Sequence, residues 1–396
     1  MSLRASLNVW LFLFGFLWTL AEVPLGLHAA AFGHWFELST VARNLAASGQ
    51  FRDPFGTPTG PTAHVAPVYA GILAAAIVIF KDPGRIVPAM IVLNAILIGI
   101  SAALLPAISQ RVYGAAAPGI LGGVLLSLSN WLMPQWEVAL STMLLIGATF
   151  AILERGPGQA GLWCGASFLT NPTSLAALGL MALYRRARFA AGALALALLM
   201  CAPWMLRNQV ELGSPYFIRD NLGLELWLSN SGRSSPETVT NWPLWNLHPN
   251  QNPEEAKVVA AMGEGRYNQM RMREARQWIG SHPKDFLRLT AGRAFYYWLP
   301  ARREGWPAPL YWFLTAAGAW GLWLSRRNRL ALLLALASVL YSGTFLLTAT
   351  HLRHRYPSLW IWALLAGYAI VSHRAWRALG SRLKQGAAAL MQVMMK

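Results

Sequence analysis

Long runs of apolar residues alternate with short polar turns over most of the chain. A helix that crosses a bilayer needs about 20 predominantly apolar residues, and several runs approach that length. The pattern therefore predicts an all-α fold, a polytopic transmembrane helix bundle of about ten spans. The expected spans lie near residues 8–30, 66–80, 87–109, 115–133, 136–153, 159–184, 189–206, 307–325, 330–350 and 357–373. Asn171-Pro172 interrupts the sixth of these and allows two half-helices there.

Two polar segments, 31–65 and 207–306, interrupt the apolar pattern and are expected to lie outside the bilayer. The second is much longer than a connection requires, so we expect it to fold on the membrane surface. The chain then has four parts. These are a transmembrane core over 1–206 with the first outer loop 31–65, an outer juxtamembrane region over 207–306, C-terminal transmembrane helices over 307–373 and a basic cytoplasmic tail over 374–396.

Short amphipathic helices are expected in both outer segments. In the first, Phe36, Val41 and Leu45 have helical spacing and predict a helix that lies flat on the membrane and ends at Gly49. In the second, a helical run extends from Glu254 to Ile279, and two prolines bracket an amphipathic helix from Asp285 to Trp298. The side chains of that last helix expected to lie on lipid are Phe286, Leu289, Ala291, Phe295 and Trp298.

Composition and charge support a membrane protein. Hydrophobic residues make up 55% of the chain and charged residues 12%, about half the charged share of a typical soluble domain. A net charge of +17 would suggest nucleic acid in a soluble protein, but in a membrane protein it marks the cytoplasmic loops, and we expect no nucleic-acid partner. Basic clusters at 185–188, 326–329 and 374–384 share one face under alternation, so the outer segments face the periplasm of a bacterial inner membrane.

The first outer segment and the re-entry that follows it contain the motif that points to a family. In order, its features are Glu37, the helical Ala42–Leu45, Gly49 with Phe51, and Pro67 with Tyr69. This order resembles the first periplasmic loop of the GT-C glycosyltransferases that use polyprenyl-phosphate sugars, in the branch of the protein O-mannosyltransferases and the lipid A aminoarabinose transferase. Short motifs at 203–208, 219–230, 248–286 and 351–357 continue the resemblance over most of 1–373.

The resemblance implies an inverting hexosyl or pentosyl transferase that moves a sugar from a polyprenyl-phosphate donor to an acceptor at the outer face. Glu37 would be the general base that takes the proton of the acceptor hydroxyl. The donor phosphate needs cations, and the fork of Arg can bind two of its oxygens. The expected phosphate ligands are Arg219, Arg355, Arg353, Arg207 and His351, and the further substrate-binding candidates are His64, Tyr69, Asn221, Glu225 and Tyr356.

Other roles for these residues stay open. Arg207 could anchor to lipid headgroups, and His351 with His354 could be interfacial polar residues. Glu22 and Glu137, in or beside apolar spans, are either substrate contacts or structural residues. The tryptophans expected to anchor at the interface or to stack on sugars are Trp35, Trp227, Trp242 and Trp245.

The cysteines and the acidic residues of the first outer loop bear on metal chemistry. Cys164 and Cys201 lie in apolar segments, and this count argues against a zinc or iron–sulfur enzyme. Glu37 and Asp53, the next candidate base, make a poor metal cage by themselves, although a divalent cation could assist. The alternative functions are a transporter or flippase for lipid-linked saccharides and a polysaccharide ligase. The sequence does not identify the sugar, or whether the acceptor is a glycan, a lipid or a protein.

Overall fold

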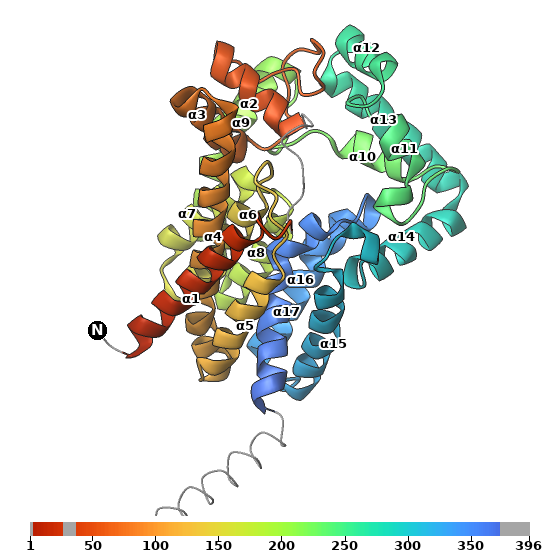
Figure 1. Ribbon diagram of the computed structural model, residues 1–396. Helices are drawn as coiled ribbons and strands as arrows, with labels where there is room; N and C mark the ends of the chain where they lie inside the picture. Colours follow the sequence, from red (N-terminus) through yellow and green to blue (C-terminus); the bar gives the residue numbers. More distant parts are fainter. Residues whose placement is uncertain (1–2, 27–36, 373–396) are drawn as a thin grey trace, which may run out of the picture.

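The computed structural model describes residues 3–26 and 37–372, and within these ranges the fold is all-helical (Figure 1). The expectations for Trp35 and for the tail 374–396 lie outside the described residues. The helices are α1 (Leu3–Ala21), α2 (Glu37–Ser48), α3 (Pro67–Phe80), α4 (Pro83–Tyr113), α5 (Ala117–Leu128), α6 (Val138–Glu154), α7 (Pro157–Thr170), α8 (Ser174–Arg185), α9 (Ala187–Leu212), α10 (Leu222–Ser229), α11 (Trp242–Asn246), α12 (Pro253–Met262), α13 (Glu264–Ser281), α14 (Pro283–Trp298), α15 (Ala308–Leu324), α16 (Arg329–Leu347) and α17 (Leu352–Ser372), with 3₁₀ turns η1 (Thr238–Thr240) and η2 (Arg302–Glu304).

The apolar runs of the sequence form the helices of the bundle, α1, α3 to α9 and α15 to α17. Among the described residues, three of them, α4, α9 and α16, are long and apolar enough to cross a membrane. The total of about ten spans stays a prediction. The expected span 159–184 is two helices, α7 and α8, because Asn171 leaves the helix in an extended conformation and its side chain accepts a hydrogen bond from the Thr173 amide.

Glycines allow α17 to approach its neighbours closely. A Cβ atom at Gly321 of α15 would overlap the carbonyl of Leu365, and one at Gly367 of α17 would overlap the carbonyl of Pro118. These backbone contacts leave no room for a side chain and fix the rotation of α17 against α5 and α15. The first turn of α17 holds His351, Arg353 and Arg355 or directly adjoins them, so this packing decides where each of them points.

The two outer segments meet at one end of the bundle, in the upper part of Figure 1, where the loop after α2 contacts α10, α12 and α13. Phe55 of the first segment packs into a small apolar core with Leu224 and Leu228 of α10 and Val259 of α12. The expected helical run 254–279 is present as α12 and α13, divided at Gly263 with φ +82°. The outer region therefore fixes the first outer loop through a small apolar core that is separate from the core of the bundle.

The helices expected in the outer segments are confirmed, with one difference. Helix α2 ends at Ser48, before Gly49 with φ +72°, and α14 extends from Pro283 to Trp298. Leu289 of α14 is buried rather than available to lipid, whereas Phe295 is exposed. Because α14 packs against α16, one face of the helix that the sequence assigned to lipid contacts protein instead.

Candidate active site

Glu37, His64 and His248 come together from three separate parts of the chain. Glu37 is the first residue of α2, His64 lies in the loop before α3, and His248 follows α11. One ligand atom from each residue lies within 4.8 Å of the other two, and Nδ1 of His248 is 3.6 Å from Oε1 of Glu37. Their exposed fractions are only 9%, 3% and 6%. The site is therefore a compact cluster that is largely shielded from water.

The two imidazoles differ in their hydrogen bonds. Nδ1 of His248 accepts a hydrogen bond from the amide of Asn250 at 3.1 Å, which orients the ring. Nδ1 of His64 is buried with no hydrogen-bond partner. Burial, followed by the nearby His248 and Arg219, lowers the pKa of His64 well below its usual range. His64 is therefore neutral at physiological pH, with an unused ring nitrogen inside the site.

This cluster fits a divalent metal ion. A carboxylate and two neutral imidazoles are donors that zinc favours, and three protein ligands leave a position open for a substrate or water. The unpaired nitrogen of His64 is the kind of buried atom that a ligand would satisfy. The sequence argument against zinc counted cysteines and did not anticipate that two histidines would join Glu37. His248 in particular was noted only as part of a motif, with no role assigned.

Arg219 and Arg353 are cations whose charge no carboxylate neutralises in a direct ion pair. Nε of Arg219 donates to the carbonyl of His64 at 2.8 Å, and Nε of Arg353 donates to Nε2 of His354 at 3.2 Å. The Arg353 guanidinium also lies over the ring of Trp136, 3.9 Å from its centroid. Among the described residues, neither arginine takes part in an ion pair. Their terminal nitrogens are thus available for an anionic ligand.

Arg353 interacts electrostatically with Glu37 and with Arg219. The charges of three acids favour the charged form of Arg353, and the charge of Arg219 disfavours it. The acids are Glu137, Glu37 and Glu225. Arg219 is in turn tied to His64 by its hydrogen bond to the backbone. The structure therefore brings together Glu37, two histidines and two unpaired cations.

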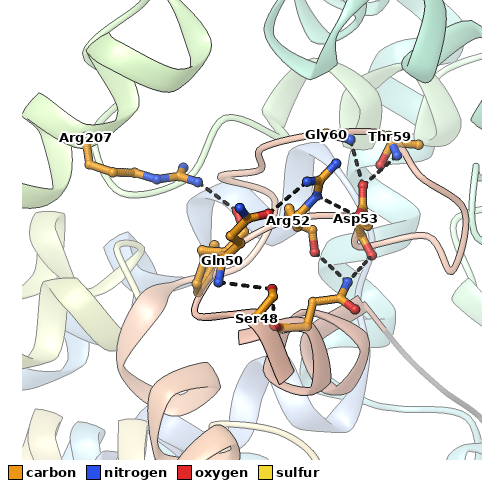
Figure 2. Close-up of polar contacts among 9 residues, drawn as sticks. Ser48, Gln50, Arg52, Asp53, Thr59, Gly60 and Arg207 are labelled. Atoms are coloured by element: carbon orange, nitrogen blue, oxygen red, sulfur yellow. Dashed lines mark hydrogen bonds and ion pairs between the residues drawn. The ribbon is translucent and has the colours of Figure 1, made fainter. Parts of the chain in front are cut away.

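Two other arginines, which the sequence predicts to bind phosphate, donate their hydrogen bonds to groups of the protein itself. Arg207 donates to the carbonyl of Phe51 at 2.7 Å, the contact with the loop that Figure 2 shows. It also donates to the carbonyl of Thr62 at 2.6 Å and so clamps the first outer loop to α9. Arg355 donates to the carbonyl of Trp298 and to Oγ1 of Thr315, both at 2.7 Å. Both guanidinium groups donate to acceptors of the protein itself, and both join separate elements of the fold.

Asp53, the second candidate base, closes a turn. Its carboxylate accepts hydrogen bonds from the amides of Thr59 and Gly60, each at 2.7 Å, and from Nε of Arg52 at 2.8 Å (Figure 2). Asn44 of α2 donates to the carbonyl of Arg52 at 3.0 Å. These contacts give the carboxylate a structural role in the loop that delivers His64.

Several of the remaining candidates hold helices together. The hydroxyl of Tyr69 donates to the carbonyl of Pro134 at 2.7 Å, and that of Tyr356 donates to the carbonyl of Leu126 at 3.0 Å. Glu22 accepts from the Asn130 side chain at 3.0 Å and from the amide of Leu132 at 2.9 Å. These contacts join separate parts of the bundle and give one carboxylate oxygen of Glu22 two donors within the protein.

The other candidates lie closer to Arg353. Glu225 accepts from the side chain of Asn221 at 3.1 Å. One carboxylate oxygen of Glu137 is buried with no hydrogen bond. His351 stacks on Trp131, with ring centroids 5.6 Å apart, and burial together with Arg353 lowers the pKa of His351 to about 3. His351 is therefore neutral and can offer a phosphate only a hydrogen bond.

Comparisons with known proteins identify the fold. No protein-family model matches the chain, and no curated protein matches it. The archaeal oligosaccharyltransferase AglB from Archaeoglobus fulgidus, solved in complex with an inhibitory peptide and a dolichol-phosphate, aligns with a TM-score of 0.51 and 11% identity over 97% of this chain and 52% of that chain. The chain has an oligosaccharyltransferase-like fold.

A second similar structure is a crystal structure of the Archaeoglobus fulgidus oligosaccharyltransferase in complex with Zn and sulfate, with a TM-score of 0.47 and 13% identity over 91% of this chain and 49% of that chain. The chain thus spans about half the length of the solved structures it matches. At 11% identity this similarity concerns the fold alone, and the GT-C resemblance of the motifs rests on the sequence.

Proposed function

We propose that this chain is a membrane glycosyltransferase that moves a sugar from a polyprenyl-phosphate donor to a hydroxyl acceptor at the outer face of the membrane. One observation carries the proposal: a shielded carboxylate, Glu37, lies in one site with two arginines, Arg219 and Arg353, that no acid pairs. Unpaired cations at a shielded site are costly unless an anion binds there. The AglB structure of similar fold contains a dolichol-phosphate, which supports a lipid phosphate as that anion.

The chemistry follows from these positions. The Glu37 carboxylate takes the proton of the acceptor hydroxyl as its oxygen bonds to the anomeric carbon from the side opposite the phosphate. The bond between that carbon and the phosphate oxygen breaks, and the electron pair leaves with the polyprenyl phosphate. Arg219 and Arg353 stabilise the charge that develops on this leaving group. Attack from the opposite side inverts the configuration of the sugar.

The histidines support this chemistry in one of two ways. The ring of His248, oriented by the amide of Asn250, packs beside the Glu37 carboxylate and limits where it can move. A divalent metal ion held by Glu37, His64 and His248 would supply a Lewis acid for the phosphate. His64 also joins the two halves of the site, because its ring lies near Glu37 and its carbonyl accepts from Arg219.

The test is Glu37→Gln, compared with Glu37→Asp, in purified protein supplied with a panel of polyprenyl-phosphate sugars. Gln keeps the size of the side chain but accepts no proton, so turnover should fall by about 10²–10⁴-fold while donor binding changes little. Asp keeps the carboxylate and should retain part of the activity. Glu254→Gln, at an exposed position of α12, is the matched control and should be fully active.

Two results would count against the proposal. Normal transfer by Glu37→Gln would remove the base from this residue. A flippase would be favoured if wild-type protein binds the donor, does not cleave it and moves it across the membrane of vesicles. Metal content measured on the same samples distinguishes a general base from a metal ligand at Glu37. If Glu37 is a metal ligand, Glu37→Gln loses the ion along with the activity.

A further inference from the structure

Asp220 and Glu264 are buried carboxylates that contact the same residue, Ala63. Asp220 lies in the segment before α10, and Glu264 is the first residue of α13. The amide of Asp220 donates to the carbonyl of Ala63 at 3.2 Å, and the amide of Ala63 donates to Oε1 of Glu264 at 2.7 Å. Their exposed fractions are 6% and 2%. Glu264 through its carboxylate and Asp220 through its backbone amide therefore both hold Ala63, directly before His64.

The same contacts lead to the candidate active site. Oγ1 of Thr62 donates to Oε2 of Glu264 at 2.6 Å and accepts from the amide of His64 at 2.9 Å. On the other side, Arg219 is the neighbour of Asp220 in the chain and donates to the carbonyl of His64 at 2.8 Å. The backbone of His64 is thus held from both sides. Thr62, which Glu264 contacts, accepts from its amide, and Arg219, the chain neighbour of Asp220, donates to its carbonyl.

Within residues 3–26 and 37–372, no direct ion pair balances the charge of the two acids. Both carboxylate oxygens of Asp220 are buried without a hydrogen-bond partner. The basic groups that face the pair are Arg207 from α9 and Arg219, but the hydrogen bonds of these arginines go to backbone carbonyls. Glu211 also acts on Arg207. Two negative charges side by side in this setting would be strongly unfavourable.

Protonation relieves this arrangement. Burial is the main cause that raises the pKa of both Asp220 and Glu264, and the charge of Glu264 raises that of Asp220 further. A protonated carboxyl donates a hydrogen bond, and the unpartnered oxygens of Asp220 have a neighbour that can accept it. One proton held between the two carboxyl groups forms a hydrogen bond where two anions would repel each other.

We propose that Asp220 and Glu264 share one proton and together act as positioning residues that fix His64 and Arg219 in the candidate active site. Neither acid touches a reacting atom. Loss of the proton leaves two adjacent buried anions, which repel each other and loosen the hold on residues 62–64. The positioning part rests on the function proposed above, whereas the shared proton does not.

Thermal unfolding of the purified protein in detergent tests the shared proton without any substrate. A carboxyl with a raised pKa in the folded state contributes stability below its usual pKa, and that stability is lost as the pH rises through the folded value. The Tm of wild-type protein should therefore decline as the pH rises above about 4. In Glu264→Gln the side-chain amide donates to Asp220 at every pH, at the expense of one of the two hydrogen bonds that Glu264 accepts, so this pH-dependent decline should be largely removed.

Two further variants complete this test. Glu264→Ala removes both acceptors and should unfold at lower temperature at every pH, while the control Glu254→Gln should follow wild type. A Glu264→Gln protein that declines with pH as wild type does, or that is destabilised as much as Glu264→Ala, overturns the shared proton.

Binding of a short-chain polyprenyl phosphate, measured from pH 5 to 9, tests the positioning. Wild-type affinity should fall at alkaline pH, and that of Glu264→Gln should stay constant over the range in which wild type declines. Glu264→Ala should bind at least about 10-fold more weakly at all pH values, the loss of one charge-assisted contact. Affinity of Glu264→Ala equal to wild type overturns the positioning role. No binding by wild type contradicts the proposed function and the positioning with it, and the unfolding result still decides the shared proton.

Discussion

Arg353 and Arg355 stand two residues apart at the beginning of α17, and their replacement by Ala should have opposite consequences. Arg353 donates one hydrogen bond within the protein, to His354, and its terminal nitrogens are available to a ligand. Arg355 donates to the carbonyls of Trp298 and Tyr297 and to Thr315. The first should therefore act in binding and the second in the fold.

The magnitudes follow from these contacts. A charge-assisted hydrogen bond to phosphate is worth about 1.5–3 kcal/mol, so Arg353→Ala should weaken binding of a polyprenyl phosphate by about 10- to 150-fold. Its effect on stability should stay near 1 kcal/mol, the value of one ordinary hydrogen bond. Arg355→Ala leaves the carbonyl of Tyr297 and the hydroxyl oxygen of Thr315 without this donor and removes one of the two donors to the carbonyl of Trp298, at about 1 kcal/mol each. It also opens a cavity where a buried side chain was. A loss of about 3 kcal/mol or more in stability is expected.

The assay pairs thermal unfolding with lipid-phosphate binding on both variants in the same nanodiscs. Arg353→Lys serves as a second control and should recover only part of the affinity, because an ammonium group cannot bind two oxygens in a planar fork. The reasoning is refuted if Arg353→Ala binds the lipid phosphate normally. It is refuted equally if Arg355→Ala is as stable as wild type yet has lost binding, since that result would exchange the two roles.

Two more predictions concern the metal site and the topology. Purified wild-type protein incubated with zinc should retain the ion by elemental analysis, and His64→Ala and His248→Ala should each retain much less; equal retention by all three would remove the site from these residues. Thr57→Cys and Ser235→Cys, in the two outer segments, should both react with an impermeant thiol reagent in intact cells, and protection of either would contradict their placement on one face of the membrane.

Much of the helical structure was predictable from local pattern. Apolar runs predicted the helices of the bundle, Gly49 ended α2 where a positive φ was needed, and the amphipathic α14 was recognised by its period. These features depend on interactions within about one helical turn, so the residue order contains them. The division of the run 254–279 at Gly263 was not predicted. The lipid-facing assignment of Leu289 was wrong because burial depends on which helix packs against α14.

The composition of the site was decided by tertiary structure. Glu37 was predicted from a motif, but its neighbour His248 comes from a distant part of the chain, and no spacing rule relates the two. Arg353 and Arg355 appeared equivalent in the sequence, yet residues two apart on a helix point to nearly opposite sides. The close glycine contacts of α17 fix its rotation, and that packing turns Arg355 toward α14 and α15 and leaves Arg353 free for a ligand.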